Sequence, residues 1–170
     1  MDIITGVNKD TKILYEDDTV LLFNDKFAVS VHGEHVDVIP RRVIEDITKL
    51  TAEDIPLVKK LYEIGLKHLE TRGFCERLGI PKEQLPDWVT AGYNYPVSVK
   101  HLHLHLVLPP FKHEKVFIYP RWHSHQKVLA DLEKHGRVIV YEEEPNETEG
   151  QLVYDRAISN HRRALQHESN

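Results

Sequence analysis

The run His101-Leu-His-Leu-His-Leu-Val-Leu108 constrains the fold more than any other segment of the chain. Apolar and histidine residues alternate with period two, which predicts a β-strand that ends before Pro109-Pro110. His101, His103 and His105 would then share one face of the strand, and the leucines would share the other. The leucine face predicts contact with a core. The histidine face predicts a polar site, because three stacked imidazoles are a costly way to fill a core.

Three interpretations of the histidine row compete. The row could be a solvated strand face, although histidine has no special preference for strands. It could bind zinc or iron, but such sites usually need a further carboxylate, cysteine or distant histidine, and none has a recognisable spacing here. It could also be a catalytic row without metal, in which one imidazole attacks and its neighbours bind phosphate oxygens or pass on a proton. We favour this third interpretation.

The first half of the chain predicts a hairpin and a long helix. Residues 12–16 and 19–24 read as a hairpin, and strands at 28–31 and 36–39 bracket a turn at 32–34. Thr51 is a good N-cap, with Asp54 three residues later as a variant of the capping box. Apolar residues at helical spacing follow from Ile55 to Leu69, and Gly73 is expected to end this helix.

The second half predicts a loop at 76–87, strands at 88–93 and 100–108, a short strand at 138–141 and an amphipathic helix at 151–167. Ser124 is expected to cap a helix that runs through His135 and ends at Gly136. These elements predict an α+β fold: an antiparallel sheet with one long helix and a C-terminal helix. Residues 1–141 are expected to form the domain, and 142–170 an acidic loop with a C-terminal tail or helix.

Composition narrows the class of protein. The chain has 170 residues, which is enough for one hydrophobic core. Its net charge is −5 and no run of Lys or Arg exceeds two residues, so a nucleic-acid partner is not expected. The single cysteine, Cys75, excludes an internal disulfide and a cysteine-based zinc finger, which suits a reducing compartment. No long apolar run predicts a signal peptide or membrane helix. We therefore expect a cytoplasmic protein, with a nuclear location as the alternative.

Several motifs now point to one family. Residues 101–107 match the pattern His-φ-His-φ-His-φ-φ, in which φ is apolar, at all seven positions. The segment 13–25 resembles the first hairpin of the histidine triad superfamily of nucleotide hydrolases and transferases. Residues 35–42 resemble its His-x-Leu-Val-Ile-Pro-Lys strand. Residues 92–96 and 116–122 look most like two branches, the third histidine triad nucleotide-binding protein group and the catalytic domain of aprataxin.

The resemblance implies roles for the histidines. His103, the middle imidazole, would attack the α-phosphorus and form a covalent nucleotidyl-histidine that water then cleaves. His101 and His105 would hold phosphate oxygens and keep His103 in the right tautomer. His35 matches the fourth histidine of the family, behind the triad. Ser98 lies where the family often has a hydroxyl near the scissile bond. The catalytic set is therefore His35, Ser98, His101, His103 and His105.

The resemblance also implies a nucleotide site. Asp25 matches an acidic residue that accepts hydrogen bonds from both ribose hydroxyls, and Phe23 would line a purine pocket. The amide of Asn94 could donate to a phosphate oxygen or fix a turn. Trp122 and His123 match aromatic positions near the site mouth, or simply pack. The expected nucleotide-binding residues are Phe23, Asn24, Asp25, Asn94, Ser98, His103 and His105.

The resulting functional hypothesis is a hydrolase of adenosine 5′-monophosphoramidate or related AMP conjugates. It needs no cofactor and no metal, binds a small purine nucleotide, and by analogy forms a homodimer without membrane association. One alternative is aprataxin-like removal of adenylate from nucleic-acid 5′ ends, which the missing cysteines and basic balance disfavour. Another is a nucleotide-binding protein with weak catalytic activity.

Overall fold

The computed structural model describes residues 10–113, 117, 121–141 and 149–169. Within these ranges the protein forms one six-stranded sheet in the order β1-β2-β3-β5-β4-β6, and every neighbouring pair is antiparallel. The strands are β1 Ile13–Glu16, β2 Val20–Asn24, β3 His35–Pro40, β4 Thr90–Asn94, β5 Leu104–Val107 and β6 Trp122–Ser124. The sheet and its helices confirm the predicted α+β class. No helix among the described residues is long and apolar enough to cross a membrane.

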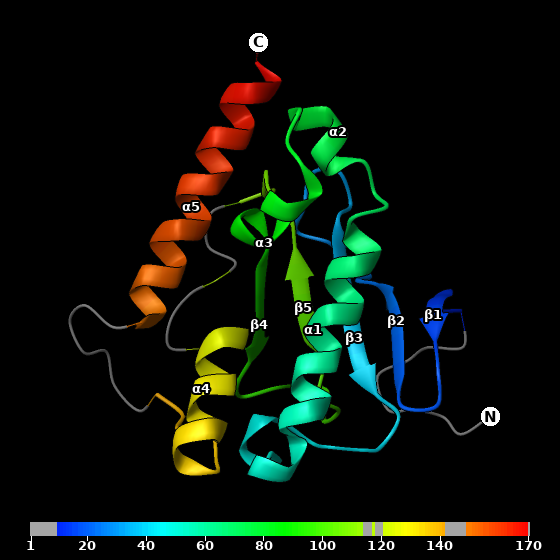
Figure 1. Ribbon diagram of the computed structural model, residues 1–170, viewed down its shortest axis with the longest axis vertical. Coiled ribbons are helices and arrows are strands. Elements are labelled where there is room, and N and C mark those ends of the chain that lie inside the picture. Colours follow the sequence, from blue (N-terminus) through cyan, green and yellow to red (C-terminus); the bar gives the residue numbers. More distant parts are fainter. Residues whose placement is uncertain (1–9, 114–116, 118–120, 142–148, 170) are drawn as a thin grey trace.

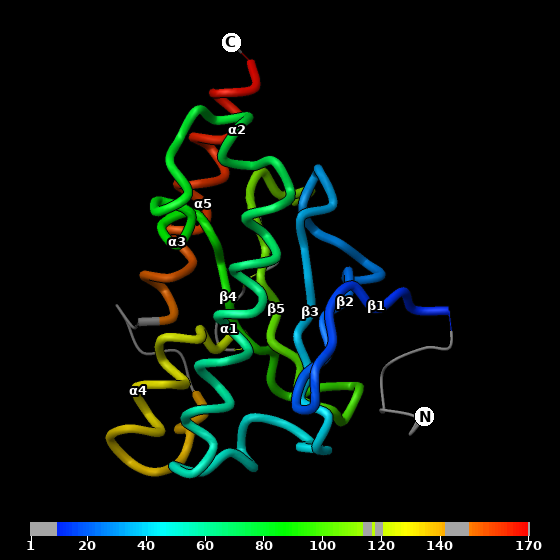
Figure 2. Tube along the Cα trace, turned by 45° about the vertical axis from the view of Figure 1, so that its right-hand side comes forward, coloured from blue at the N-terminus to red at the C-terminus, as the bar shows by residue number. Residues whose placement is uncertain are grey.

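Helices cover the sheet on one face and at one edge. In Figure 1, α1 crosses in front of β3 and β5, and α5 lies beyond β4. The tube in Figure 2 shows the hairpin of β1 and β2 at the opposite edge from α5. The helices are η1 Ile47–Lys49, η2 Ala52–Asp54, α1 Ile55–Leu69, α2 Phe74–Leu78, η3 Lys82–Gln84, α3 Leu85–Trp88, α4 His125–His135 and α5 Glu149–Glu168.

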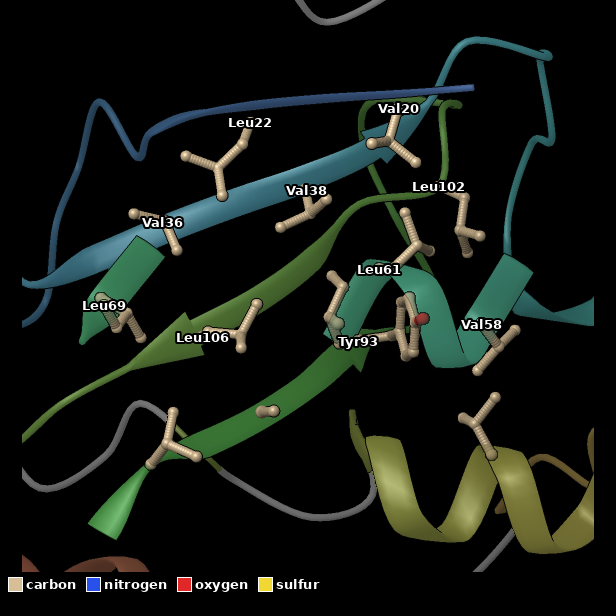
Figure 3. Close-up of a cluster of buried hydrophobic side chains, with 14 of the residues drawn as sticks. Val20, Leu22, Val36, Val38, Val58, Leu61, Leu69, Tyr93, Leu102 and Leu106 are labelled. Carbon is tan, nitrogen blue, oxygen red and sulfur yellow. The ribbon is translucent and has the colours of Figure 1, made fainter. Parts of the chain in front are cut away.

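The main core lies between the sheet and α1. Alternate strand residues such as Val36, Val38 and Leu106 point toward the helix (Figure 3). Leu104 belongs to the same core cluster, and all four side chains are fully buried. Gly65 lets α1 approach the sheet closely, because a Cβ atom there would lie within 3 Å of the Leu106 side chain. The residues that alternate with these strand residues therefore point to the opposite face of the sheet, and they include His35, Asp37 and His105.

Two small apolar clusters flank that opposite face. Leu21, Phe23 and Ile39 form the first cluster, at the β2–β3 side. The second cluster contains residues of β5, β6, α5 and the segment between them: Val107, Phe111, Phe117, Trp122 and Ala157. The polar residues of β3 and β5 thus lie between two apolar walls. This arrangement removes them from bulk water without placing them in the main core.

Several predicted elements are confirmed. Thr51 and Asp54 form a capping box at the start of η2, which leads directly into α1. The side chain of Ser124 accepts a hydrogen bond from the Lys127 amide, and Gly136 ends α4 with a φ of 69°. The C-terminal helix is present as α5, with Ala157 and Ile158 buried. Two of its leucines, Leu152 and Leu165, are exposed, although the amphipathic pattern predicts buried apolar residues. The acidic segment 142–148 lies outside the described residues.

The predicted strand at 100–108 is too long, because pairing begins only at Leu104. The Leu102 amide donates to the Ile44 carbonyl rather than to a neighbouring strand, so His101 and His103 lie on the segment that enters β5. Leu102 is nevertheless buried and His103 is only partly buried. The alternation thus distinguishes Leu102 from His103 where the ladder is absent, but it does not predict His101, which is also buried.

The predicted loop at 76–87 is wrong, because α2, η3 and α3 occupy this region. Burial of Phe74, Leu85 and Trp88 favours these short helices over a loop. Gly73 does not end α1, which stops at Leu69. With a φ of 90°, it precedes α2.

Two further predicted strands are absent, and a third is displaced. In the segment 28–31 only Ser30 pairs, in an isolated bridge to Phe111. Residues 138–141 form no strand, because the Ile139 amide donates to the Asp131 carboxylate of α4 over 3.0 Å. The strand expected at 88–93 begins at Thr90, because α3 extends through residue 88.

Candidate active site

A hydrogen bond fixes one ring nitrogen of His103, and the other has no hydrogen-bond partner among the described residues. Its Nδ1 lies 2.7 Å from the backbone carbonyl oxygen of His101, an acceptor that requires a proton on Nδ1. The lone pair therefore resides on Nε2. The ring lines a pocket of about 230 Å³, and burial, aided by His105, lowers its pKa. A neutral imidazole that lines a pocket and keeps the lone pair on Nε2 is a competent nucleophile.

His101 is anchored rather than free. Its Nε2 donates a hydrogen bond of 2.8 Å to the Pro40 carbonyl oxygen at the end of β3, and the side chain is buried. Its Nδ1 has no hydrogen-bond partner among the described residues. The contact with Pro40 holds the segment that carries His101 and His103 against β3.

His35 and His105 meet in the face behind the pocket. The amide of Val29 donates to Nδ1 of His35 over 3.1 Å, so the proton of this neutral ring lies on Nε2. His35 Nε2 is 2.9 Å from His105 Nδ1. Burial lowers the pKa of His35 to about 3, and the positive charge of His105 acts in the same direction. The predicted grouping of His35 with the triad is therefore present in the geometry.

A buried carboxylate completes this cluster, and the sequence reasoning missed it. Asp37 stands directly opposite His105 in the β3–β5 register, and its Oδ1 lies 2.9 Å from His105 Nδ1. Asp25 Oδ2 lies 3.4 Å from both imidazoles. Alternation from His35 would have placed Asp37 on the same face, and this was the available signal. In the strand pattern His-x-Leu-Val-Ile-Pro-Lys, which residues 35–41 resemble, the position of Asp37 is occupied by Leu.

These contacts set the charges in the cluster. Burial by itself would lower the pKa of His105, but the carboxylates of Asp37 and Asp25 outweigh it and raise that pKa well above its ordinary value. Burial likewise opposes ionisation of Asp25, but hydrogen bonds with His105 and Asp37 lower its pKa. For Asp37, burial raises the pKa to about 7 although the charge of His105 opposes this, so the Asp37 carboxylate is ionised above neutral pH. His105 is thus the favoured carrier of positive charge, and His35 and His103 are neutral. In this state His35 Nε2 and His105 Nδ1, which lie 2.9 Å apart, both carry protons, so the first N–H is directed at Asp25 Oδ2 at 3.4 Å and the second at Asp37 Oδ1 at 2.9 Å.

The same cluster has the composition of a metal site. One donor atom from each of Asp25, His35, Asp37 and His105 lies within 4.8 Å of the others. In the present arrangement, however, the Val29 amide leaves the proton of neutral His35 on Nε2, the atom that faces the cluster. His35 thus presents a hydrogen-bond donor and not a lone pair. The geometry describes a hydrogen-bonded network of imidazoles and carboxylates.

Two pockets adjoin this network. The pocket of about 230 Å³ has apolar walls from Phe23, Ile39 and Val99, and its polar lining includes Asp25 and His103. A second pocket of about 190 Å³ lies on the other side of Asp25, which lines both. Asn94, His105, Phe117 and Trp122 contribute to its lining. The two pockets suit the two ends of a substrate whose reacting centre lies near the histidines.

The remaining predicted residues divide into two groups. Asn24 lines the larger pocket, and its side-chain oxygen accepts a 2.8 Å hydrogen bond from Arg72, a residue that sequence reasoning did not select. Ser98 is exposed in the loop after β4 and lines neither pocket. Trp122 is buried with its ring centroid 6.1 Å from that of His105. His123 points away and stacks on Tyr141, so it does not belong to the site mouth.

Comparisons with known proteins agree with this geometry. The family described as "Scavenger mRNA decapping enzyme C-term binding" matches residues 1–117. The chain is 32% identical over 109 residues to adenosine 5′-monophosphoramidase HINT3 of Danio rerio, covering 63% of this chain and 61% of that protein. It is 26% identical over 137 residues to aprataxin of the same organism, covering 76% of this chain and 39% of that protein. The chain therefore spans less than two thirds of the length of these curated relatives.

Among solved structures, the aprataxin ortholog Hnt3 of Schizosaccharomyces pombe superposes with a TM-score of 0.52 at 19% identity. The match covers 91% of this chain and 86% of that one, and it concerns the fold. With its antiparallel sheet, its long helix and its row of histidines, the chain belongs to the histidine triad superfamily. The resemblance stated from the motifs is thereby confirmed.

Proposed function

We propose that this protein hydrolyses adenosine 5′-monophosphoramidate or a related AMP conjugate through a covalent intermediate on His103. The observation that carries the proposal is the hydrogen bond between His103 Nδ1 and the His101 carbonyl oxygen. It commits the lone pair to Nε2, on the ring that lines the larger pocket. The similarity to HINT3, named as an adenosine 5′-monophosphoramidase, supports this substrate class.

The reaction would proceed in two displacements. In the first, Nε2 of His103 attacks the α-phosphorus, the P–N bond breaks, and the amine leaves with a proton delivered from the active site. In the second, water attacks the same phosphorus, the bond to Nε2 breaks, and the proton lost by water replaces the one consumed. The sum is phosphoramidate plus water giving AMP plus amine. His105 is assigned to the phosphate oxygens. His101, whose Nε2–H is committed to the Pro40 carbonyl oxygen, is assigned to holding His103 in its tautomer through its own carbonyl oxygen.

The larger pocket is assigned to the nucleoside. The Asp25 carboxylate would accept hydrogen bonds from the ribose hydroxyls, and its lowered pKa keeps it ionised for that task. Phe23 and Ile39 would contact the base. Asn24 also lines this pocket, and Asn94 would reach the phosphate from the second pocket. We retain Ser98 as a predicted catalytic hydroxyl near the scissile bond; unchanged kcat in Ser98→Ala would remove it.

A second candidate is removal of adenylate from a nucleic-acid 5′ end. The aprataxin similarity covers 76% of this chain, and one structural neighbour was solved as an Hnt3 complex with DNA, with a TM-score of 0.50. Helix α5 also presents Arg162 and Arg163 at one surface pocket and Arg156 at another. These cations offer phosphate contacts that the net charge of the chain did not predict. The first candidate is preferred, because the net charge of the chain is −5 and because its identity to the HINT3 phosphoramidase, 32%, exceeds its 26% identity to aprataxin.

One assay panel separates the candidates. Wild-type protein and His103→Ala would be incubated with AMP phosphoramidate, a dinucleoside polyphosphate and 5′-adenylated DNA, and AMP release would be measured. We expect the phosphoramidate to give the highest kcat/KM, and the variant to be inactive on every substrate. A preference for adenylated DNA would select the second candidate, while binding without turnover would indicate a nucleotide-binding protein. We also propose a cytoplasmic homodimer, which light scattering and localisation of a tagged chain would test.

A further inference from the structure

The site contains a carboxylate that the proposed mechanism does not use. Asp37 is only 6% exposed, and its nearest partner is the imidazole of His105 at 2.9 Å. A buried carboxylate lowers stability unless a charge or hydrogen bond compensates it. The position does not require a polar residue for folding, because its neighbours on the same face of β2 and β3 are Phe23 and Ile39. The contact with His105 is therefore the physical reason for an aspartate here.

The strand register gives this contact its geometry. Asp37 and His105 are directly opposed on β3 and β5, and opposed side chains on one face of an antiparallel pair lie within reach of each other. The Oδ1 atom of Asp37 forms an ion-pair contact with Nδ1 of the His105 ring. The other nitrogen, Nε2, is buried without a hydrogen-bond partner among the described residues. Because His105 lines the second pocket, Nε2 is the atom that remains to bind substrate.

The groups around His105 favour the charged ring. Asp37 faces it from β3, and Asp25 faces it from the segment after β2 at 3.4 Å. His35 on β3 and His103 before β5 are neutral imidazoles, whose pKa values burial lowers. From β4 and β6 the ring faces Gly92 and Trp122, which do not titrate. Two carboxylates facing one imidazole stabilise the imidazolium.

Resting on the proposed function, we infer that Asp37 is a positioning residue: it orients His105 and holds it as an imidazolium whose Nε2–H binds a phosphate oxygen. A charged donor is roughly twice as strong as a neutral one. A cation fixed beforehand also stabilises charge that develops on the phosphoryl group without rearrangement. The consequence is that phosphate stabilisation persists at alkaline pH, where an ordinary histidine would be uncharged.

Two variants separate orientation from charge. Asp37→Asn keeps an oxygen that can accept from Nδ1–H but removes the negative charge. Asp37→Leu removes both and restores the residue type of the strand pattern that this segment resembles. Asp54→Asn serves as the matched control, because it removes another buried carboxylate, one that pairs with Arg42 and lines neither pocket of the site. All would be compared with wild type for kcat and KM between pH 5 and pH 10.

The two variants should differ in a defined way. In Asp37→Asn the alkaline limb of kcat should move down by about one pH unit or more, with kcat near pH 6 retained, since a unit of pKa reflects the lost charge interaction. Asp37→Leu should show the same movement and, in addition, a lower kcat at every pH. The profile of Asp54→Asn should follow wild type. Profiles of both Asp37 variants that superimpose on the wild-type profile would overturn the inference.

A measurement without substrate keeps this inference separate from the proposed function. NMR titration of the His105 ring should give a pKa well above 6.5 in wild type and a value at least about one unit lower in Asp37→Asn. If His103→Ala proved fully active, the proposed function would fail, while the titration would still decide the role of Asp37. An unchanged His105 titration in the variant would reject the role of Asp37 and leave the function of His103 intact.

Discussion

The Nδ1 atom of His103 lies 2.7 Å from the carbonyl oxygen of His101, two residues earlier in the chain. This local contact decides the tautomer of the middle histidine without help from any distant group. It places the lone pair on Nε2 of a ring that lines the larger pocket. A nucleophile oriented by its own backbone needs little reorganisation before attack.

Asp25→Asn should weaken AMP binding by about 1–3 kcal/mol, because a charge-assisted contact to the ribose diol is replaced by a neutral one. The amide should affect 2′-deoxy-AMP less, since that ligand offers only one of the two hydroxyls. Calorimetric titration of both ligands into both proteins measures the difference. Equal losses for the two nucleotides would show that Asp25 does not read the diol.

Gly92→Ala should disturb the aromatic wall beside His105. A Cβ atom at residue 92 would lie 2.5 Å from the Trp122 ring and 2.7 Å from the His123 carbonyl oxygen. Overpacking of this kind costs about 1–3 kcal/mol in unfolding free energy, and the shifted tryptophan should also lower turnover. Chemical denaturation and kcat measure the two effects.

Gly136→Ala is the matched control for that experiment. Gly136 has a φ of 69° at the end of α4, with open space where a Cβ atom would be placed. Alanine there strains the backbone, so stability should fall while turnover is unchanged. A Gly92→Ala protein with normal stability and normal kcat would contradict the close packing of β4 against Trp122.

Acid should destabilise the fold in the range from about pH 6.5 to pH 4. His125 is 5% exposed and stacks on Tyr62, and burial lowers its pKa from 6.5 to about 4. In this pH range His125 binds a proton in the unfolded chain but not in the folded chain, so stability is lost as pH falls through the range. His125→Phe should remove about 2 kcal/mol of the stability that wild type loses at pH 5, because pH 5 lies about 1.5 units below the ordinary pKa of histidine in the unfolded chain.

Urea unfolding at pH 5 and pH 7.5 would measure the effect. His135→Gln, a change at an exposed histidine on the same helix, should leave the difference between the two pH values as in wild type. A His125→Phe protein with the full wild-type pH dependence would assign the acid sensitivity to other groups.

Turnover should survive removal of metal ions. The proposed mechanism assigns phosphate stabilisation to imidazoles and other hydrogen-bond donors of the chain, and His35 presents Nε2–H to the carboxylate cluster. Dialysis against a strong chelator should therefore leave kcat within about twofold of the untreated protein. Complete loss of activity that zinc restores would instead support metal binding by Asp25, His35, Asp37 and His105.

The sequence predicted those parts of the fold whose signals are local. The capping box at Thr51 and the stop at Gly136 depend on neighbouring residues, and both are confirmed. The extent of the strand after Lys100 was wrong, because the Leu102 amide bonds to the distant Ile44 carbonyl. A periodic pattern of apolar and polar residues does not indicate such a distant hydrogen-bond partner. The short helices around Trp88 were missed for a related reason, since burial against distant elements stabilises helices too short for a repeat.

The residues of the candidate site also divide into those that sequence signals predicted and those that depend on distant contacts. The histidine row and Asp25 were found through spacing and resemblance, and the fold brings them together with His35. Asp37 was missed because it interrupts an apolar strand and its partner is 68 positions away, on β5 (105 minus 37). Only the pairing register connects the two. Ser98 followed from the resemblance alone, and in the structure it is exposed and lines neither pocket.

The central claim is the covalent intermediate on His103, and rapid quenching with substrate labelled in the α-phosphate tests it most directly. We predict acid-labile, base-stable label on the wild-type protein, because protonation of the ring nitrogen makes it a better leaving group. His103→Ala and His103→Asn should carry no label and show no turnover, while nucleotide binding persists.

Two in-line displacements, each with one inversion, also predict net retention at phosphorus with a chiral phosphorothioate substrate. An inverted product, or wild-type protein without label at every quench time, would contradict the covalent mechanism even if His103 proved essential.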